Sequence, residues 1–145
     1  LESALLNTGR PGLLCPRHAP TSIGAHVAIA WNGSAESARA IAMCGSIIAE
    51  AKTVTVLAAE DAENLELSAD DLVMHLLDHG ITASAKNVKS KDSTLGESLL
   101  AAARASGADV IVMGAYGRSR GRAMVLGGVT QWVIDNTDLP VLLVH

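Results

Sequence analysis

The stretch "ADVIVMG", residues 108–114, is a continuous apolar run after its single acidic residue, and it ends at Gly114. A short run of this kind, without alternation of apolar and polar residues, predicts a strand that is buried on both faces. Strands buried on both faces are typical of parallel sheets, because crossover helices cover the two sides of such sheets. The stretch therefore predicts an α/β domain with a parallel sheet.

The segments around this strand alternate between strand and helix patterns. Further strands are predicted in "HVAIAWNGS", in "TVTVLAA", in "ITASAKNV", which alternates weakly and is expected near an edge, and in "PVLLV". Helices are predicted to begin at Ser34, Ser68, Thr94 and Gly128, and Thr94 has capping-box spacing to a glutamate. This alternation predicts a doubly wound sheet over residues 25–145, with right-handed crossovers and helices on both faces.

Composition argues against several classes of protein. The chain has 145 residues, which suits one domain, and its formal net charge of −4 argues against general nucleic-acid binding. No apolar run approaches the roughly 18 residues that a membrane-spanning helix needs. The cysteines, Cys15 and Cys44, lack CxxC spacing and are expected to be reduced, with Cys44 in the core. The default expectation is a soluble cytoplasmic domain with neither membrane nor nucleic acid as partner.

The opening of the sequence resembles its ending. When "NTGRPGLLCP", residues 7–16, is aligned with "NTDLPVLLVH", residues 136–145, the identical positions are Asn7, Thr8, Pro11, Leu13 and Leu14. We therefore expect residues 1–16 to be the last half-helix and last strand of a preceding domain of the same kind, followed by a linker over residues 17–24. The alternative is the chance recurrence of a Pro and Leu-Leu pattern in an aliphatic protein.

Two predicted strand ends carry unusual residues. In doubly wound sheets a ligand binds at the carboxyl ends of the strands, where the strand order reverses. One such end reads "AWNGS", and the other reads "MGAYGRSRGRAMVLGGVT", residues 113–130. The second stretch combines glycines, three arginines (Arg118, Arg120 and Arg122) and a predicted helix start, all of which suit a phosphate group. The alternative is that the glycines form ordinary turns and that the arginines belong to a solvated loop.

These stretches resemble the universal stress protein family. The spacing Gly114-x2-Gly117-x9-Gly127, before a short helix and a final "PVLLV", is similar to the family's nucleotide-binding signature. "VAIAWNGS" resembles its first strand, and "LLAAARASGADVIVMGAYGRSR" resembles its third helix, fourth strand and loop. The resemblance implies a five-stranded parallel sheet in the order 3-2-1-4-5. It also implies ATP or another adenine nucleotide, with or without Mg²⁺, between the first and fourth strands.

The candidate nucleotide-binding residues come from both strand ends and from the following helix start. They are Ala30, Trp31, Asn32, Met113, Gly114, Tyr116, Gly117, Arg118, Gly127, Gly128, Val129 and Thr130. Two of them depart from the family pattern. Gly128 stands where the family usually has serine or threonine, so that one hydroxyl is missing unless Thr130 supplies it. Asn32 stands where the family often has aspartate, and an amide cannot hold a cation as a carboxylate does.

The resemblance also implies that the final strand lies at an edge of the sheet and pairs with a second such edge in many members. An edge as apolar as residues 141–144 is expected to be covered, because unpaired strand amides promote association. We expect residues 12–15 to run antiparallel beside it, within one chain or exchanged between two. This expectation includes a homodimer or a pseudo-dimer within one chain.

The remaining candidates favour structural roles. His75 and His79 have the i, i+4 spacing of two metal ligands on a helix, but an exposed helix face is the favoured interpretation and no metal is expected. Ser34 is expected to be a helix cap, and no catalytic residue is assigned. Trp132 is expected to pack, and Tyr116 to lie near ligand. The leading function is a nucleotide-binding regulatory domain of the stress response. The alternatives are a dimerising scaffold with a degenerate site, and a slow ATPase.

Overall fold

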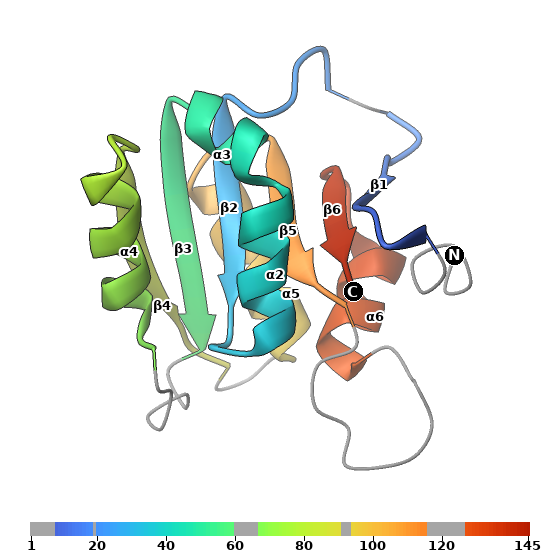
Figure 1. Cartoon of the computed structure of the whole chain (residues 1–145). Helices are drawn as coiled ribbons and strands as arrows, with labels where there is room; N and C mark the ends of the chain where they lie inside the picture. Colours follow the sequence, from blue (N-terminus) through green and yellow to red (C-terminus); the bar gives the residue numbers. More distant parts are fainter. Residues whose placement is uncertain (1–7, 19, 60–66, 91–93, 116–126) are drawn as a thin grey trace.

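The computed structural model of the chain describes residues 8–18, 20–59, 67–90, 94–115 and 127–145. Within these residues, six strands form one sheet in the order β1-β6-β5-β2-β3-β4 (Figure 1). The strands are β1 (Gly12–Leu14), β2 (His26–Trp31), β3 (Thr53–Ala59), β4 (Ala83–Val88), β5 (Val110–Gly114) and β6 (Val141–Val144). The helices are α2 (Ala35–Met43), α3 (Gly45–Glu50), α4 (Ala69–Asp78), α5 (Leu95–Ala105) and α6 (Gly128–Asn136).

The five strands from β4 to β6 are parallel and lie in the order β4-β3-β2-β5-β6. This is the order 3-2-1-4-5 that the family resemblance implies, and β4 is an edge strand as its weak alternation predicts. The sheet has one strand more than the five predicted for residues 25–145. β1 pairs antiparallel with β6, with Leu13 opposite Leu142, so that the sheet is mixed. The pairing expected for the opening segment is therefore present within one chain.

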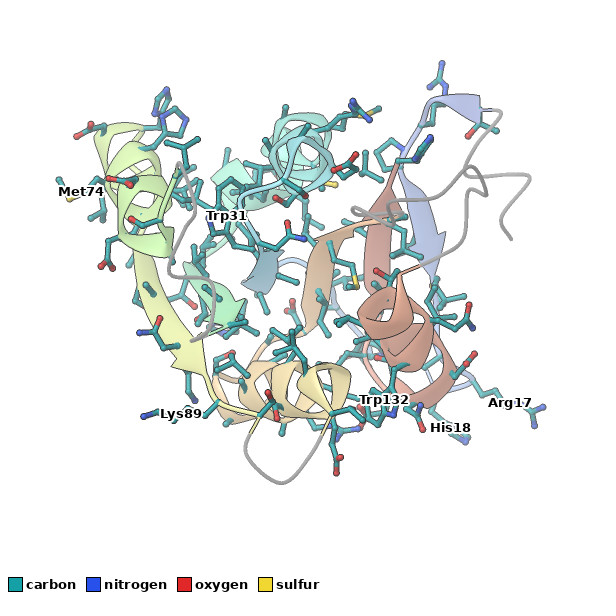
Figure 2. All side chains as sticks on the ribbon, turned by 90° about the horizontal axis from the view of Figure 1, so that it is seen from below. Arg17, His18, Trp31, Met74, Lys89 and Trp132 are labelled. Carbon is teal, nitrogen blue, oxygen red and sulfur yellow. The ribbon has the colours of Figure 1, made fainter. Side chains whose placement is uncertain are left out.

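Helices cover both faces of the sheet, as Figures 1 and 2 show. α2, α3 and α4 lie on one face and bury one set of strand residues, among them Val110 and Val112 of β5. α5 and α6 cover the other face, where Ile111 and Met113 point. Successive residues of β5 are thus buried on opposite sides, which is why "VIVM" shows no polar alternation.

The helix predicted from Ser34 is two helices, because the chain breaks at Cys44 between α2 and α3. Cys44 and Ile48 are both buried across this break. Burial raises the pKa of the Cys44 thiol, so that the group stays protonated in the core. The predicted caps are confirmed: the side-chain oxygens of Ser34, Ser68 and Thr94 each accept a backbone N–H of the helix that follows.

A carboxylate fixes the start of β2. Both oxygens of Asp109 accept backbone N–H groups, from Gly24 at 2.8 Å, from Ala25 at 3.0 Å and from His26 at 3.3 Å. Gly24 has a φ of +96°, a backbone conformation that residues other than glycine rarely adopt. This contact ties the chain that enters β2 to the residue that precedes β5, and so aligns the two strands that end at the candidate site.

Candidate functional site

The strand order reverses between β2 and β5. The chain leaves β2 toward β3 but leaves β5 toward β6, and Ala30 of β2 lies opposite Met113 of β5. The carboxyl ends of these two strands, near Asn32 and Gly114, therefore form the switch point at which doubly wound sheets bind ligands. Figure 2 shows the molecule from below Figure 1, the side at which the parallel strand arrows end.

The start of α6 differs from those of the other long helices. Its N-cap is Gly127, which offers no side-chain hydrogen bond. The first amides of an α-helix have no partner within the helix, and α2, α4 and α5 each satisfy one of them with a serine or threonine cap. Gly128 is exposed, and a Cβ placed there would meet nothing within 4 Å. The amides that begin α6 can therefore be approached by an anion.

Thr130 connects the start of α6 to the end of β5. Its side chain is buried, and its hydroxyl donates to the carbonyl oxygen of Gly114 at 3.4 Å. This distance is near the upper limit for a hydrogen bond between oxygens, so the contact is weak. The Thr130 hydroxyl, which the sequence offers as a substitute for the hydroxyl missing at Gly128, is thus directed at the backbone of Gly114.

Gly114 makes room for a helix. A Cβ at Gly114 would lie 2.8 Å from the carbonyl carbon of Glu36 and 2.9 Å from the nitrogen of Ser37, both in the first turn of α2. The missing side chain thus allows α2 to pack on the end of β5. Sequence reasoning missed Glu36 at the switch point, although its place two residues after the cap Ser34 predicts a first-turn residue.

The side chains of three predicted residues belong to the core. Trp31 is 5% exposed, and its Nε1 donates to the carbonyl oxygen of Leu67 at 3.1 Å, just before α4. Figure 2 shows its ring on the face that α2 and α4 cover. Met113 is 4% exposed and, with the half-buried Ala30, packs in the cluster under α5 and α6. These residues position the backbone at the switch point rather than offering polar groups.

Asn32 is exposed, and its Oδ1 accepts the backbone N–H of Ser34 at 3.1 Å. The Ser34 hydroxyl oxygen in turn accepts the N–H of Ser37 at 3.1 Å. The turn between β2 and α2 therefore satisfies these amides from within. The Nδ2 of Asn32 carries two further hydrogen-bond donors.

The other candidates separate into three groups. Val129 is half-buried and packs against the core under α5 and α6. Tyr116, Gly117 and Arg118 lie outside the described residues, as do Arg120 and Arg122. Trp132 packs on α5, where a Cβ at Gly96 would lie 3.0 Å from its ring, so its predicted packing role is confirmed.

The histidine pair on α4 is exposed, as expected. The ring centroids of His75 and His79 are 4.4 Å apart, and Nδ1 of His79 lies 2.8 Å from the carbonyl oxygen of His75. In the part of the chain that the structure describes, no three histidine, cysteine or acidic side chains group as metal ligands would. None of the described helices is both long and apolar enough to cross a membrane.

Comparisons with known proteins agree with the fold. Solved structures share the fold at low sequence identity. The hypothetical protein MJ0577 superposes with a TM-score of 0.71 at 21% identity, covering 85% of this chain and 96% of that one. A universal stress protein from Archaeoglobus fulgidus superposes with a TM-score of 0.76 at 20% identity, and the match covers 99% of this chain and 52% of that one. A putative universal stress protein from Pseudomonas aeruginosa superposes with a TM-score of 0.65 at 19% identity, and the match covers 99% of this chain and 55% of that one.

The chain thus spans about half the length of the latter two proteins. A search of curated proteins finds no match. The model of the universal stress protein family, however, matches residues 25–145, which run from the start of β2 through β6. This chain belongs to the universal stress protein family.

Proposed function

We propose that this domain binds ATP or a related adenine nucleotide at the carboxyl ends of β2 and β5, and that it acts as a regulatory component of a stress response. The observation that carries the proposal is the uncapped start of α6 beside Gly114 at the switch point. Helix amides and the helix dipole favour a phosphate at such a place. The sequence between β5 and α6 adds three arginines to an otherwise acidic chain.

The parts of the nucleotide would divide between the two strand ends. The phosphates fit the amides of Gly128 to Thr130, because these begin α6 and Gly128 leaves them open. The ribose or base would lie toward Asn32, whose exposed side chain follows β2. The side chains of Trp31 and Met113 are buried on opposite faces of the sheet and would hold the two strand ends in place.

Titration calorimetry with ATP tests the proposal, using Gly127→Val as the disabling variant. Gly127 has φ −57° and ψ 143°, a backbone conformation that valine readily adopts, so the variant should fold. Its side chain would crowd the first amides of α6 and should abolish the heat of binding. Gly45→Ala is the matched control, because a Cβ at Gly45 in α3 meets nothing within 4 Å. Wild-type affinity in Gly127→Val, or no binding by the native chain, would contradict the proposal.

A scaffold role is the second candidate, and the pairing of β1 with β6 favours it. The solved structures that cover 99% of this chain are about twice its length, whereas the MJ0577 protein, of similar length, covers 85%. This difference supports the proposal that β1 is the end of a preceding similar domain in a tandem protein. The two domains would then form a pseudo-dimer through β6. Exchange of β1 between two chains would form a homodimer by the same contact.

Two further properties remain proposals. A slow ATPase is the least favoured activity, because Gly128 offers no hydroxyl and Asn32 no carboxylate. A turnover assay on the nucleotide-bound protein would detect it. A cytoplasmic setting is proposed from the two cysteines, Cys15 and Cys44, which are both free thiols.

A further inference from the structure

Two histidine rings lie together at the end of α4. His75 and His79 are four residues apart, so their side chains leave the helix on the same side. Both residues are exposed, and their ring centroids are 4.4 Å apart with an angle of 45° between the ring planes. Sequence spacing alone favoured an exposed helix face for this pair. The structure adds the separation of the rings and a hydrogen bond that orients one of them.

The backbone determines which nitrogen of His79 carries the proton. Nδ1 of His79 lies 2.8 Å from the carbonyl oxygen of His75. A carbonyl oxygen only accepts hydrogen bonds, so Nδ1 donates, and in the neutral ring Nε2 keeps the lone pair. A backbone carbonyl in this role is a common partner of metal-bound histidines, because it fixes the tautomer and the orientation of the ring. The His79 ring is therefore preorganised to bind a metal ion through Nε2.

The separation of the two rings fits neighbouring ligands of one ion. A histidine nitrogen lies about 2.0–2.1 Å from a bound Zn²⁺, which places the ring centre about 3.2 Å from the ion. At that distance, ring centres 4.4 Å apart subtend an angle of about 90° at the ion. Square-planar and octahedral complexes have this angle, which Cu²⁺ and Ni²⁺ adopt, whereas tetrahedral Zn²⁺ requires about 109°. The exposed ring of His75 can rotate to present a nitrogen to the same ion.

We propose that His75 and His79 form a binding site for a divalent ion of the nickel or copper type, with water in the remaining positions. Imidazole suits these ions, and affinity for nitrogen ligands rises along the first-row metals through Ni²⁺ to Cu²⁺. The exposed carboxylates of Asp71 and Asp78 on the same helix add negative charge that attracts a cation. Asp71 itself accepts hydrogen bonds from Ser68, so it is assigned to the helix cap and not to the metal.

An ion held by both rings would join the last turn of α4 to its C-cap. α4 ends at Asp78, His79 is the C-cap, and Gly80 follows with a φ of +76°. The end of α4 leads to the start of β4, at the opposite end of the sheet from the carboxyl ends of β2 and β5 (Figure 1). The metal site is thus separate from the candidate nucleotide site, and each can be tested without the other.

The test is titration calorimetry of the whole, untagged chain with nickel chloride at neutral pH. The native chain should bind Ni²⁺, and His75→Ala and His79→Ala should each weaken binding by about tenfold or more, because each removes a ligand. His18→Ala is the matched control, since His18 is exposed and lies outside α4. Cys15→Ser tests the exposed thiol as a competing ligand. Both control variants should bind Ni²⁺ as the native chain does.

Thermal unfolding provides a second measurement. An ion that binds the folded chain raises its melting temperature, so Ni²⁺ should do so in the native chain and in His18→Ala but not in His79→Ala. Excess Mg²⁺ should not displace Ni²⁺, because Mg²⁺ prefers oxygen ligands. Absence of Ni²⁺ binding by the native chain would overturn the inference. So would native affinity in folded His75→Ala and His79→Ala, or loss of binding in Cys15→Ser. None of these outcomes bears on the proposed nucleotide site.

Discussion

Gly114 at the end of β5 packs directly against the backbone of Glu36 in the first turn of α2. A Cβ on Gly114 would come within 2.8 Å of the Glu36 carbonyl carbon, a separation that such atoms essentially never show. The glycine of the signature is thus required by the packing of a helix on a strand, before any ligand is considered. Gly128 is the contrasting case, because open space surrounds its Cα.

The first prediction concerns this contrast. Gly114→Ala should lower the free energy of unfolding by about 1–3 kcal/mol, because the backbone of α2 has to shift. Gly128→Ala should leave it unchanged or raise it by up to about 1 kcal/mol, because alanine favours the helix. Urea unfolding followed by circular dichroism measures both. Equal stability of the two variants would show that α2 does not constrain Gly114.

The second prediction concerns the missing hydroxyl. Gly128→Ser supplies the hydroxyl donor that the resemblance to the family implies at this position, and a hydrogen bond to a charged group contributes roughly 1.5–3 kcal/mol. ATP should therefore bind about tenfold more tightly or better, as measured by calorimetry. Gly45→Ser at the start of α3 is the control, since its surroundings are equally open. If Gly128→Ser brings no gain, Thr130 already supplies the hydroxyl or the natural ligand is not a triphosphate.

The third prediction concerns Asp109, whose two oxygens accept three backbone N–H groups before β2. Asp109→Asn removes the charge and one acceptor, and should cost about 1.5–3 kcal/mol of unfolding free energy. Because this carboxylate aligns β2 with β5, hydrogen exchange at Ala25 and His26 should quicken as well. Native exchange rates there, together with native stability, would show that water replaces the lost contacts.

The fourth prediction concerns pH. Arg104 donates hydrogen bonds to Asp138 and lowers the pKa of its carboxyl below the ordinary value. A carboxyl whose pKa is lowered by folding stabilises the protein above its unfolded pKa of about 3.9, and loses that contribution as pH falls through the folded pKa. The side chain of Asp138 is 65% exposed, so the contribution should be at most about 0.5 kcal/mol.

This contribution is measurable as the difference in unfolding free energy between the native chain and Asp138→Asn. The difference should be present at pH 7, shrink below about pH 4 and decrease in high salt. A difference that grows on acidification would have the wrong sign for this ion pair.

The fifth prediction concerns β1. Deletion of residues 1–16 should expose the edge of β6, an apolar strand whose outer amides β1 now covers. Light scattering should then detect a new dimer or aggregation, and the melting temperature should fall. A truncated protein that stays in its original oligomeric state with an unchanged melting temperature would show that β1 contributes nothing to the domain.

The sequence by itself determined the local features of this protein. The apolar run of β5 and the alternation of elements predicted a parallel α/β sheet, because burial on both faces leaves a periodicity that can be read along the chain. The caps Ser34, Ser68 and Thr94 were predictable because each accepts the amide N–H of the residue three positions further along the chain. The strand order came from resemblance to a family, and the sheet confirms it for the five parallel strands. The candidate site came from the same resemblance and from the residues at two strand ends, and it stays a prediction.

Only the tertiary structure decided which groups meet across long separations. Trp31 was expected near the ligand, but its ring is held by Leu67, which no local pattern connects to it. The contacts of Gly114 with Glu36 and of Asp109 with Gly24 join residues that are distant along the chain. The antiparallel pairing of β1 with β6 was expected from the sequence, but only the structure decided that it forms within one chain and not between two. These contacts depend on how the helices and strands pack in space. The hydrophobic pattern of a segment predicts whether it is a helix or a strand, but not which distant residue it will contact.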